Sequence, residues 1–306
     1  MAIEYLSAAI AQQRTAPAYL FSGPAGVGRR LVAERFLGQL LWQEAADPSK
    51  QQRRLSNHPD CLWIGPSYIH QGKPLTAQQL QAQDLPLPNS QPQVRLVQIR
   101  ALSQFLSQAP LEATQLAVVI EGAETMAEPA ANALLKTLEE PGNATVILIA
   151  PSAEALLPTL VSRCQRIPFY RLTPAEMVSI LKRVGYAEII DHPHLLEMAQ
   201  GSPGSAIAHW QQFQAIAPEL LQVDLTALQS PRACLALAQQ IDHSLELHSQ
   251  LWLLDYWQHH CWQGEQNSQI LHPLETAKQQ LLHHAQPRLV WEVTLLTVAD
   301  YIGANL

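Results

Sequence analysis

The first half of the chain alternates short apolar runs with stretches whose apolar residues recur at helical spacing. Short apolar runs predict strands at 18–21, 60–64, 116–120, 145–149 and 166–169. Helical spacing predicts helices at 29–42, 94–108 and 128–139, the last of which ends before Pro141. Apolar strands that alternate with helices favour a parallel sheet covered by helices on both faces.

Two departures from this pattern divide the rest of the chain. Residues 66–93 are rich in glutamine, proline and leucine, and we predict a long surface loop or excursion there. After about residue 170 the strand pattern fades, and Thr173, Pro174 and Glu176 predict the start of a helix. Residues 201–204 separate two helical stretches, and from about residue 210 the pattern is helical throughout.

Composition narrows the class of protein. With 47% hydrophobic and 15% charged residues, the chain can bury a sizeable core. A net charge of −7 argues against holding DNA by the chain's own field and favours a protein partner. No C-x-x-C pair is present, which disfavours a disulfide framework or a cysteine-rich zinc site. The polar N-terminal stretch and the lack of an apolar run of 18 residues favour the cytoplasm.

A glycine-rich segment between the first predicted strand and helix suggests a phosphate-binding loop. Gly23 and Gly28 match the two glycines of G-x-x-x-x-G-K-[ST], with Gly26 between them in the same loop, whose backbone amides would face one concavity. Arg29 stands in place of the lysine, and Arg30 in place of the hydroxyl that holds magnesium. An arginine has no acceptor atom for a metal. A chance glycine-rich turn is the alternative that the loop by itself leaves open.

The strand predicted at 116–120 ends in a second candidate element. In P-loop enzymes this strand end supplies an acid for magnesium, often followed by a glutamate that polarises water. Glu121 occupies the first place and Gly122 the second, and a glycine cannot act as a base. An ordinary buried strand with an acidic exit would have the same pattern.

Four segments carry a family resemblance over about residues 1–210. They are NHPD at 57–60, EPAANALLKTLEEP at 128–141, SRC at 162–164 and GSPGSA at 201–206. Together they resemble bacterial DNA polymerase III clamp loaders, which are AAA+ proteins, and the departures from an active ATPase resemble the family's delta-prime branch. The resemblance implies an α/β AAA+ P-loop core at 1–170, a small helical lid at 171–209 and an all-helical collar at 210–306.

The resemblance also assigns roles to single residues. Arg163, within Ser162-Arg163-Cys164, would be an arginine finger that reaches the ATP site of a neighbouring subunit. The place of the family's sensor arginine is held by Gly204. With the changes at Arg29, Arg30 and Gly122, this implies a non-hydrolysing subunit of the DNA polymerase III holoenzyme that stimulates its neighbour.

The implied partners are the delta and tau or gamma subunits in a hetero-oligomer, with the beta sliding clamp and primed DNA reached through the complex. No cofactor is expected to be required, although ATP or ADP could still bind the glycine loop. No metal is expected, because His58 and Cys61 supply at most two zinc ligands. The histidine pairs at 259–260 and 283–284 are interpreted as parts of packed or solvated helix faces, not as metal ligands. The alternatives are an active tau/gamma-type ATPase and a structural nucleotide-binding module without turnover.

Overall fold

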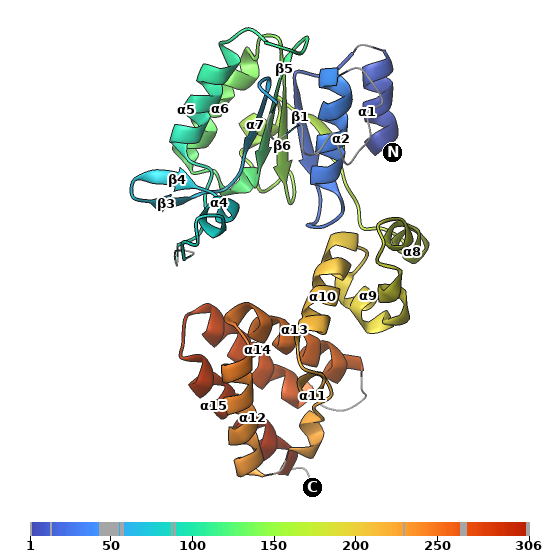
Figure 1. Cartoon of the computed structure of the whole chain (residues 1–306), viewed down its shortest axis with the longest axis vertical. Helices are drawn as coiled ribbons and strands as arrows, with labels where there is room; N and C mark the ends of the chain where they lie inside the picture. Colours follow the sequence, from blue (N-terminus) through green and yellow to red (C-terminus); the bar gives the residue numbers. More distant parts are fainter. Residues whose placement is uncertain are drawn as a thin grey trace. The chain divides into compact units, whose positions relative to one another are not determined.

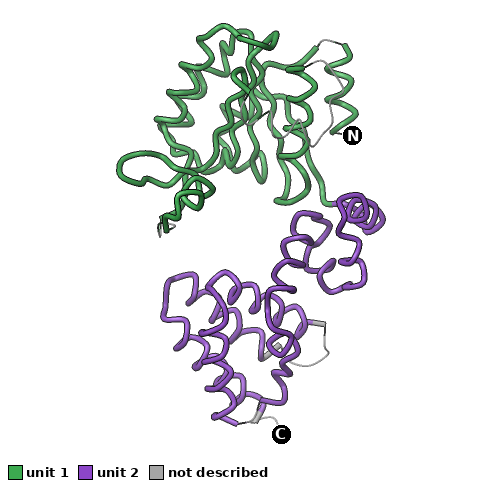
Figure 2. The backbone as a smooth tube through the Cα atoms, in the orientation of Figure 1, with its two compact units in different colours: residues 1–171 green, residues 172–306 purple. Residues whose placement is uncertain are grey.

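The structure is a computed structural model that describes residues 2–12, 14–42, 55, 58–86, 88, 90–228, 230–263 and 268–303. The chain forms two compact units, residues 1–171 and 172–306, which are green and purple in Figure 2. The strands of the described chain all belong to the first unit, and the second unit is helical.

A parallel sheet forms the centre of the first unit (Figure 1), and it has five strands. Its strands are β1 (Ala18–Ser22), β2 (Cys61–Ile64), β5 (Leu116–Glu121), β6 (Ala144–Ala150) and β7 (Gln165–Pro168), in the order β2-β5-β6-β1-β7. All five predicted strands are confirmed, each end within one residue. Because the strands are parallel, their ends form one edge of the sheet, here called the carboxyl edge, and their beginnings form the opposite amino edge.

Helices cover both faces of this sheet, which explains why its strands are apolar on both sides. In Figure 1, α1 (Ala2–Ala11) and α2 (Arg29–Trp42) cover one face, and α5 (Leu96–Leu106), α6 (Glu128–Glu139) and α7 (Pro158–Val161) cover the other. Side chains along β1 alternate between the two layers: Tyr19 and Phe21 pack with α2, and Leu20 packs with α5 and α6. The helices predicted at 29–42 and 128–139 have the bounds observed for α2 and α6.

The excursion at 66–93 contains more regular structure than the predicted surface loop. A hairpin of β3 (Tyr68–His70) and β4 (Lys73–Leu75) is followed by the short helix α4 (Ala77–Gln81). The hairpin turns through Gln71 and Gly72, both with positive φ (48° and 80°), as a tight two-residue turn requires. Helix α4 begins with a capping box between Thr76 and Gln79. Strands of three residues are too short to show a repeating pattern, so the sequence analysis missed them.

The second unit consists of short helices followed by longer ones. Its elements are α8 (Pro174–Arg183), η2 (Ala187–Asp191), α9 (Pro193–Ala199), α10 (Pro203–Ala215), α11 (Pro218–Leu221), η3 (Leu225–Ala227), α12 (Pro231–Ser244), α13 (Leu247–Gln263), α14 (Ser268–Leu282) and α15 (Pro287–Gly303). The predicted helix start is confirmed, and a capping box forms there, since Glu176 N donates to Thr173 Oγ1 and Thr173 N donates to Glu176 Oε2. The predicted border between residues 209 and 210 falls inside α10.

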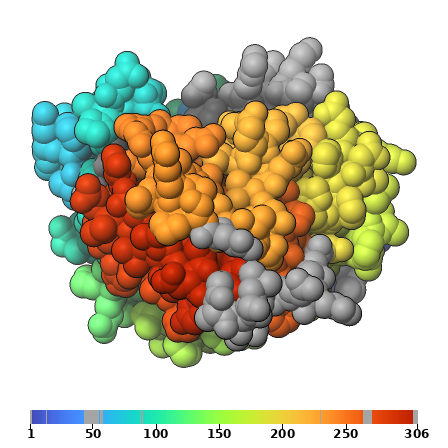
Figure 3. Space-filling view, turned by 90° about the horizontal axis from the view of Figure 1, so that it is seen from below, coloured from blue at the N-terminus to red at the C-terminus, as the bar shows by residue number. Residues whose placement is uncertain are grey.

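Two apolar clusters form the interior of the second unit. The smaller one lies among α8, η2, α9 and α10 and includes Met177 and Leu181. The larger one joins α11 to α15 around Trp291, which is fully buried and donates its indole N–H to Gln250 Oε1 at 2.8 Å. Helices α12 and α15, orange and red in Figure 3, pack against each other in this part. Among the described residues, no helix combines the length and the hydropathy needed to cross a membrane.

Candidate functional site

The glycine loop lies at the carboxyl edge of the sheet, between β1 and α2. Gly26 and Gly28 have φ angles of 74° and 94°, which favour glycine. Gly23 lies so close to the chain after β7 that an added Cβ would be 2.3 Å from the Phe169 carbonyl oxygen. The expected strand, glycine turn and helix are therefore present, and Gly23 is required by the packing of backbone against backbone.

Arg29, in the place of the phosphate-binding lysine, is turned to the protein's own backbone. Its Nη1 donates a hydrogen bond to the carbonyl oxygen of Ala150, the last residue of β6. Burial lowers the pKa of the Arg29 guanidinium, and the carboxylates of Glu124 and Glu121 partly offset this by raising it. The guanidinium remains charged, so the loop keeps a cation, but that cation is tied to the sheet.

Arg30, in the sequence place of the magnesium-holding hydroxyl, forms an ion pair with Glu121. Arg30 Nη1 lies 2.9 Å from Glu121 Oε2, and Arg30 Nε lies 3.0 Å from Glu34 Oε1. Trp63 Nε1 also donates to Glu121 Oε2 at 3.2 Å, and the Arg30 guanidinium stacks 4.9 Å from the centre of the Trp63 ring. The acid expected to face magnesium thus has a guanidinium and an indole N–H as its partners. These residues do not fit a magnesium–nucleotide complex.

Gly122, in the place of the water-polarising glutamate, has a left-handed conformation at φ 64° and ψ 40°. A Cβ at this position would lie 2.6 Å from Pro66 Cγ. The Gly122 carbonyl accepts a hydrogen bond from Thr125 Oγ1 at 2.7 Å, which fixes the turn after β5. The backbone at this position therefore favours glycine on conformational and steric grounds, whatever the chemistry of the site.

Asp60, in the NHPD segment, has a role in the structure that sequence reasoning did not assign. Its buried carboxylate accepts three backbone N–H bonds of 2.7 Å, from Leu111, Glu112 and Ala113. These bonds fix the turn that leads into β5. Asn57 and residues 43–54 are outside the described residues. Burial raises the pKa of the Cys61 thiol to about 12, so it stays protonated at neutral pH.

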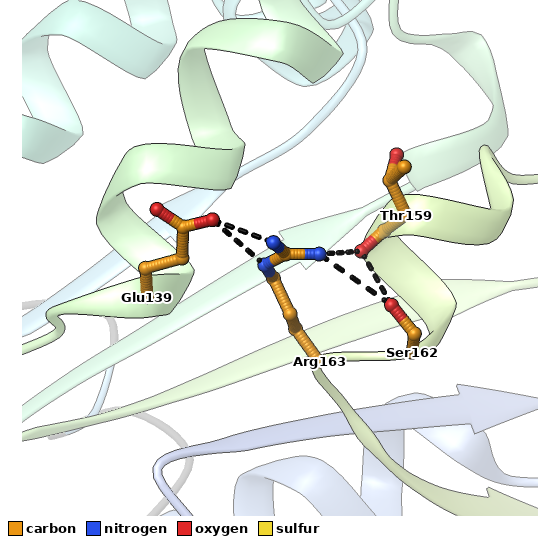
Figure 4. A network of polar contacts seen from close by, with 4 residues as sticks. All are labelled: Glu139, Thr159, Ser162 and Arg163. Atoms are coloured by element: carbon orange, nitrogen blue, oxygen red, sulfur yellow. Dashed lines mark hydrogen bonds and ion pairs between the residues drawn. The ribbon is translucent and has the colours of Figure 1, made fainter.

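Arg163 lies between α7 and β7, and Figure 4 shows its contacts. Its Nε and Nη2 donate to Glu139 Oε1 at 3.1 and 2.6 Å, and its Nη1 donates to the Thr159 carbonyl oxygen at 3.0 Å. Ser162 Oγ lies 3.5 Å from Nη1 and donates to the same carbonyl oxygen. The Arg163 side chain retains 35% of its exposure. The guanidinium is therefore held by two neighbours while part of it still faces solvent.

The glycine loop and Arg163 lie at opposite edges of the sheet. In the pairing of β1 with β7, Tyr19 is opposite Gln165 and Ser22 is opposite Pro168. Gly23 follows the carboxyl end of β1, whereas Arg163 precedes the amino end of β7. At a rise of about 3.3 Å per residue, this pairing alone separates the two edges by roughly 10 Å. Arg163 and its own glycine loop therefore belong to two separate surfaces.

The other candidate residues, Cys164 and Gly204, lie where contacts serve packing and helix capping. Burial raises the pKa of the Cys164 thiol to about 11, and the side chain packs against the apolar layer of α5 and α6. Gly204 is exposed in the first turn of α10, where Ser202 Oγ accepts from Ser205 N at 3.2 Å. Sequence reasoning missed Glu139 as the partner of Arg163, although the acidic pair before Pro141 was a visible signal.

The histidines at 259 and 260 belong to a packed cluster in the second unit. This histidine cluster comprises His192, His194, His209, His259 and His260, on α9, α10, α13 and the residue before α9. The rings of His194 and His260 lie 5.5 Å apart, and His259 Nε2 lies 3.4 Å from Glu197 Oε2. Within the described ranges, no three His, Cys, Asp or Glu side chains are arranged to hold a metal ion.

Burial lowers the pKa of several members of this cluster. For His194, burial acts first, and the neighbouring His260, His192 and His259 add to it, against a smaller opposite effect of Glu197. Burial lowers the pKa of His260 and His209 as well. His209 Nδ1 accepts a hydrogen bond from Trp252 Nε1 at 2.9 Å, which fits a neutral ring. His194, His209 and His260 therefore favour the uncharged imidazole.

Comparison with known families covers nearly the whole chain. Residues 1–173 match the family described as DNA polymerase III, delta subunit, and residues 175–298 match the family described as Cyanobacterial DNA polymerase III delta prime, C-terminal domain. The chain belongs to the DNA polymerase III delta-prime family. The resemblance predicted an AAA+ core followed by a helical region, and the structure confirms this fold.

Individual relatives of this delta-prime family member match over parts of their length. The delta-prime subunit of Pseudomonas aeruginosa is 36% identical over 157 residues, which cover 49% of this chain and 42% of that protein. The Bacillus subtilis delta-prime subunit is 31% identical over 172 residues, covering 54% and 45%. The Bacillus subtilis tau subunit is 26% identical over 227 residues, covering 72% and 37%. The chain thus spans less than half the length of these curated relatives.

A solved structure shares the fold over the whole chain. It is a gamma subunit-related protein of DNA polymerase III from Thermotoga maritima, with a TM-score of 0.57 and 15% identity, covering 99% of this chain and 100% of that one. At this identity, the likeness concerns the fold alone.

Proposed function

We propose that this delta-prime family member is a clamp-loader subunit that supplies Arg163 to the ATP site of an adjoining subunit and hydrolyses no ATP itself. The observation that carries the proposal is the position of Arg163 at the amino edge, opposite its own glycine loop and partly exposed. A planar guanidinium that remains charged can bind two phosphate oxygens and offset the charge that develops during phosphoryl transfer.

The condition of the glycine loop supports the second half of the proposal. Arg29 donates to the Ala150 carbonyl, and Arg30 pairs with Glu121, so the chain's own groups occupy the expected lysine and metal positions. Gly122 offers no base. We therefore propose that the loop requires no nucleotide. We also propose that the protein uses no zinc, because His58 and Cys61 supply at most two ligands.

The proposed partners follow from the family. The relatives are named as delta-prime, tau and gamma/tau subunits of DNA polymerase III. We infer a hetero-oligomer with delta and tau or gamma subunits that loads the beta sliding clamp on primed DNA, with the second unit as lid and collar. The net charge of −7 fits DNA contact that depends on the whole complex.

The alternative is an active ATPase of the tau/gamma type, which the match to the Bacillus subtilis tau subunit favours. Isothermal titration of the purified chain with ATP, with and without magnesium, separates the two functions. An active ATPase would bind magnesium–ATP and turn it over, whereas the proposed subunit shows no turnover. Measurable hydrolysis by the chain alone would overturn the proposal.

The decisive variant is Arg163→Ala, assayed in the reconstituted complex. Loss of an arginine finger lowers the rate by about 10³ to 10⁵ at the site served, and the total rate falls less where other sites keep their own fingers. Arg166→Ala, an exposed arginine on β7, is the matched control and should leave the rate unchanged. Clamp loading at the normal rate by the Arg163 variant would contradict the proposed role.

A further inference from the structure

The contacts of Arg163 identify a second residue that acts on the same surface. We propose that Glu139 is a positioning residue. It holds the Arg163 guanidinium in the orientation needed to contact a phosphate group bound to the partner subunit. This inference rests on the proposed function of Arg163 in a neighbouring ATP site. The Glu139 carboxylate would repel a phosphate group, so it cannot bind the nucleotide itself. Its proposed role is to act through Arg163.

Both groups that hold Arg163 stand on ordered elements. Glu139 is the last residue of α6, directly after the buried Leu138. Thr159 belongs to α7, where the neighbouring Leu160 is fully buried. The guanidinium is thus held from two sides, by a side chain and by a backbone carbonyl, as Figure 4 shows. Buried neighbours restrict movement of these two anchors, so the bonds define a direction for the guanidinium.

The pattern of hydrogen bonds leaves part of the guanidinium available. Arginine carries five N–H groups in a rigid planar fork. The bonds to Glu139 and Thr159 use three of them: the Nε–H, one N–H of Nη2 and one N–H of Nη1. Nη2 retains one further N–H, and the second N–H of Nη1 has only the long 3.5 Å contact with Ser162 Oγ, at the limit of hydrogen-bond distance. Two N–H groups are what a bidentate contact with phosphate oxygens requires. Glu139 therefore restrains the arginine without using all of its donors.

The exposure of Glu139 and Arg163 indicates that their ion pair positions Arg163 and does not lock it away from a partner. The side chains of Glu139 and Arg163 are 51% and 35% exposed, and pairs between exposed groups contribute little free energy. Such a pair cannot compete with a multiply charged phosphate for the guanidinium. It can limit the rotamers of a long, flexible side chain before the partner arrives, which lowers the entropy lost on contact. The expected effect of Glu139 is therefore on the rate of the chemical step.

The test measures ATP hydrolysis by the reconstituted complex over a range of ATP concentrations. Glu139→Ala should lower kcat about two- to five-fold at the site that Arg163 serves, which is the range for an exposed ion pair, and should leave KM unchanged. Glu139→Gln should restore part of the rate, because its amide oxygen still accepts a hydrogen bond. Glu140→Ala, an exposed acid next in sequence, is the matched control and should not change kcat.

A double variant separates this inference from the proposed function. Glu139→Ala combined with Arg163→Ala should be no slower than Arg163→Ala alone, because Glu139 acts only through Arg163. If Arg163→Ala has no effect, both proposals fail. If Arg163→Ala is slow but Glu139→Ala is normal, or is faster than the parent as a latch would make it, only the role of Glu139 is overturned. Unchanged melting temperatures show that each variant is folded.

Discussion

Substitution of Asp60 by asparagine should have one of the largest effects of any isosteric change in the first unit. Asp60 is 1% exposed, and its two carboxylate oxygens accept three backbone N–H bonds of 2.7 Å. Asparagine keeps one acceptor and turns an NH₂ group toward a backbone donor. Hydrogen bonds to a charged group contribute about 1.5–3 kcal/mol each, and an unpaired buried donor costs about 1–3 kcal/mol. We expect the unfolding free energy to fall by about 3–5 kcal/mol.

Urea unfolding and hydrogen exchange of the full chain measure this effect. The amides of Leu111, Glu112 and Ala113 should exchange faster in Asp60→Asn, whereas Asp84→Asn, at an exposed carboxylate, serves as the control. A loss below about 1 kcal/mol with unchanged exchange at these amides would refute the reasoning, because one unpaired buried donor alone costs that much.

Acidification tests the same contact in a second way. Burial raises the pKa of Asp60, but its three N–H donors and His58 outweigh burial and hold the pKa below the ordinary 3.8. The stabilisation is therefore complete above the unfolded pKa and is lost as pH falls through the folded pKa. The difference between the parent and Asp60→Asn should be constant near neutral pH and should shrink below about pH 4. A difference that stays constant down to pH 3 would contradict the assignment.

Two further predictions concern glycine and histidine positions. Gly122→Ala should lower the unfolding free energy by about 1–3 kcal/mol, and more than Gly142→Ala does, because both glycines have φ of 64° but only the first would place its Cβ against Pro66. Equal melting temperatures for the two variants would argue against the close approach. His194, His209 and His260 should make the second unit less stable as pH falls below about 6.5, since their unfolded imidazoles take up protons that the folded ones exclude. His194→Gln should flatten that dependence in urea unfolding, while the exposed His284→Gln should not, and an unchanged slope in the first variant would count against the cluster.

Local pattern was enough to predict the five strands of the central sheet and helices α2, α5 and α6, because both faces of this sheet are covered. Apolar residues in β1, β5 and β6 are required on both sides, so these strands are distinct in the sequence from the amphipathic helices around them. Helix α2 begins directly after a glycine turn, and α6 ends shortly before Pro141; glycine turns and prolines are strong local signals of helix boundaries.

The contacts of the candidate site could not be predicted in the same way, because they join residues far apart in the chain. Arg163 and Glu139 are separated by 24 positions, and Arg30 and Glu121 by 91. The sequence analysis interpreted Arg30 as the replacement of a magnesium-holding hydroxyl and Glu121 as a separate acid at a strand end. In the structure the two side chains form an ion pair. Only the parallel order of the strands, which brings the ends of β1 and β5 to the same edge, makes that ion pair possible.

The close contact between Gly23 and Phe169 has a consequence for how such proteins diverge. A side chain at Gly23 would overlap the Phe169 backbone, so selection on this position acts through folding even where no phosphate is bound. The lysine and hydroxyl positions carry no such constraint, and Arg29 and Arg30 now occupy them. A chain with this fold can therefore keep its glycines for packing reasons, whatever side chains follow them at positions 29 and 30. Glycine spacing by itself is then evidence of the fold rather than of a working nucleotide site.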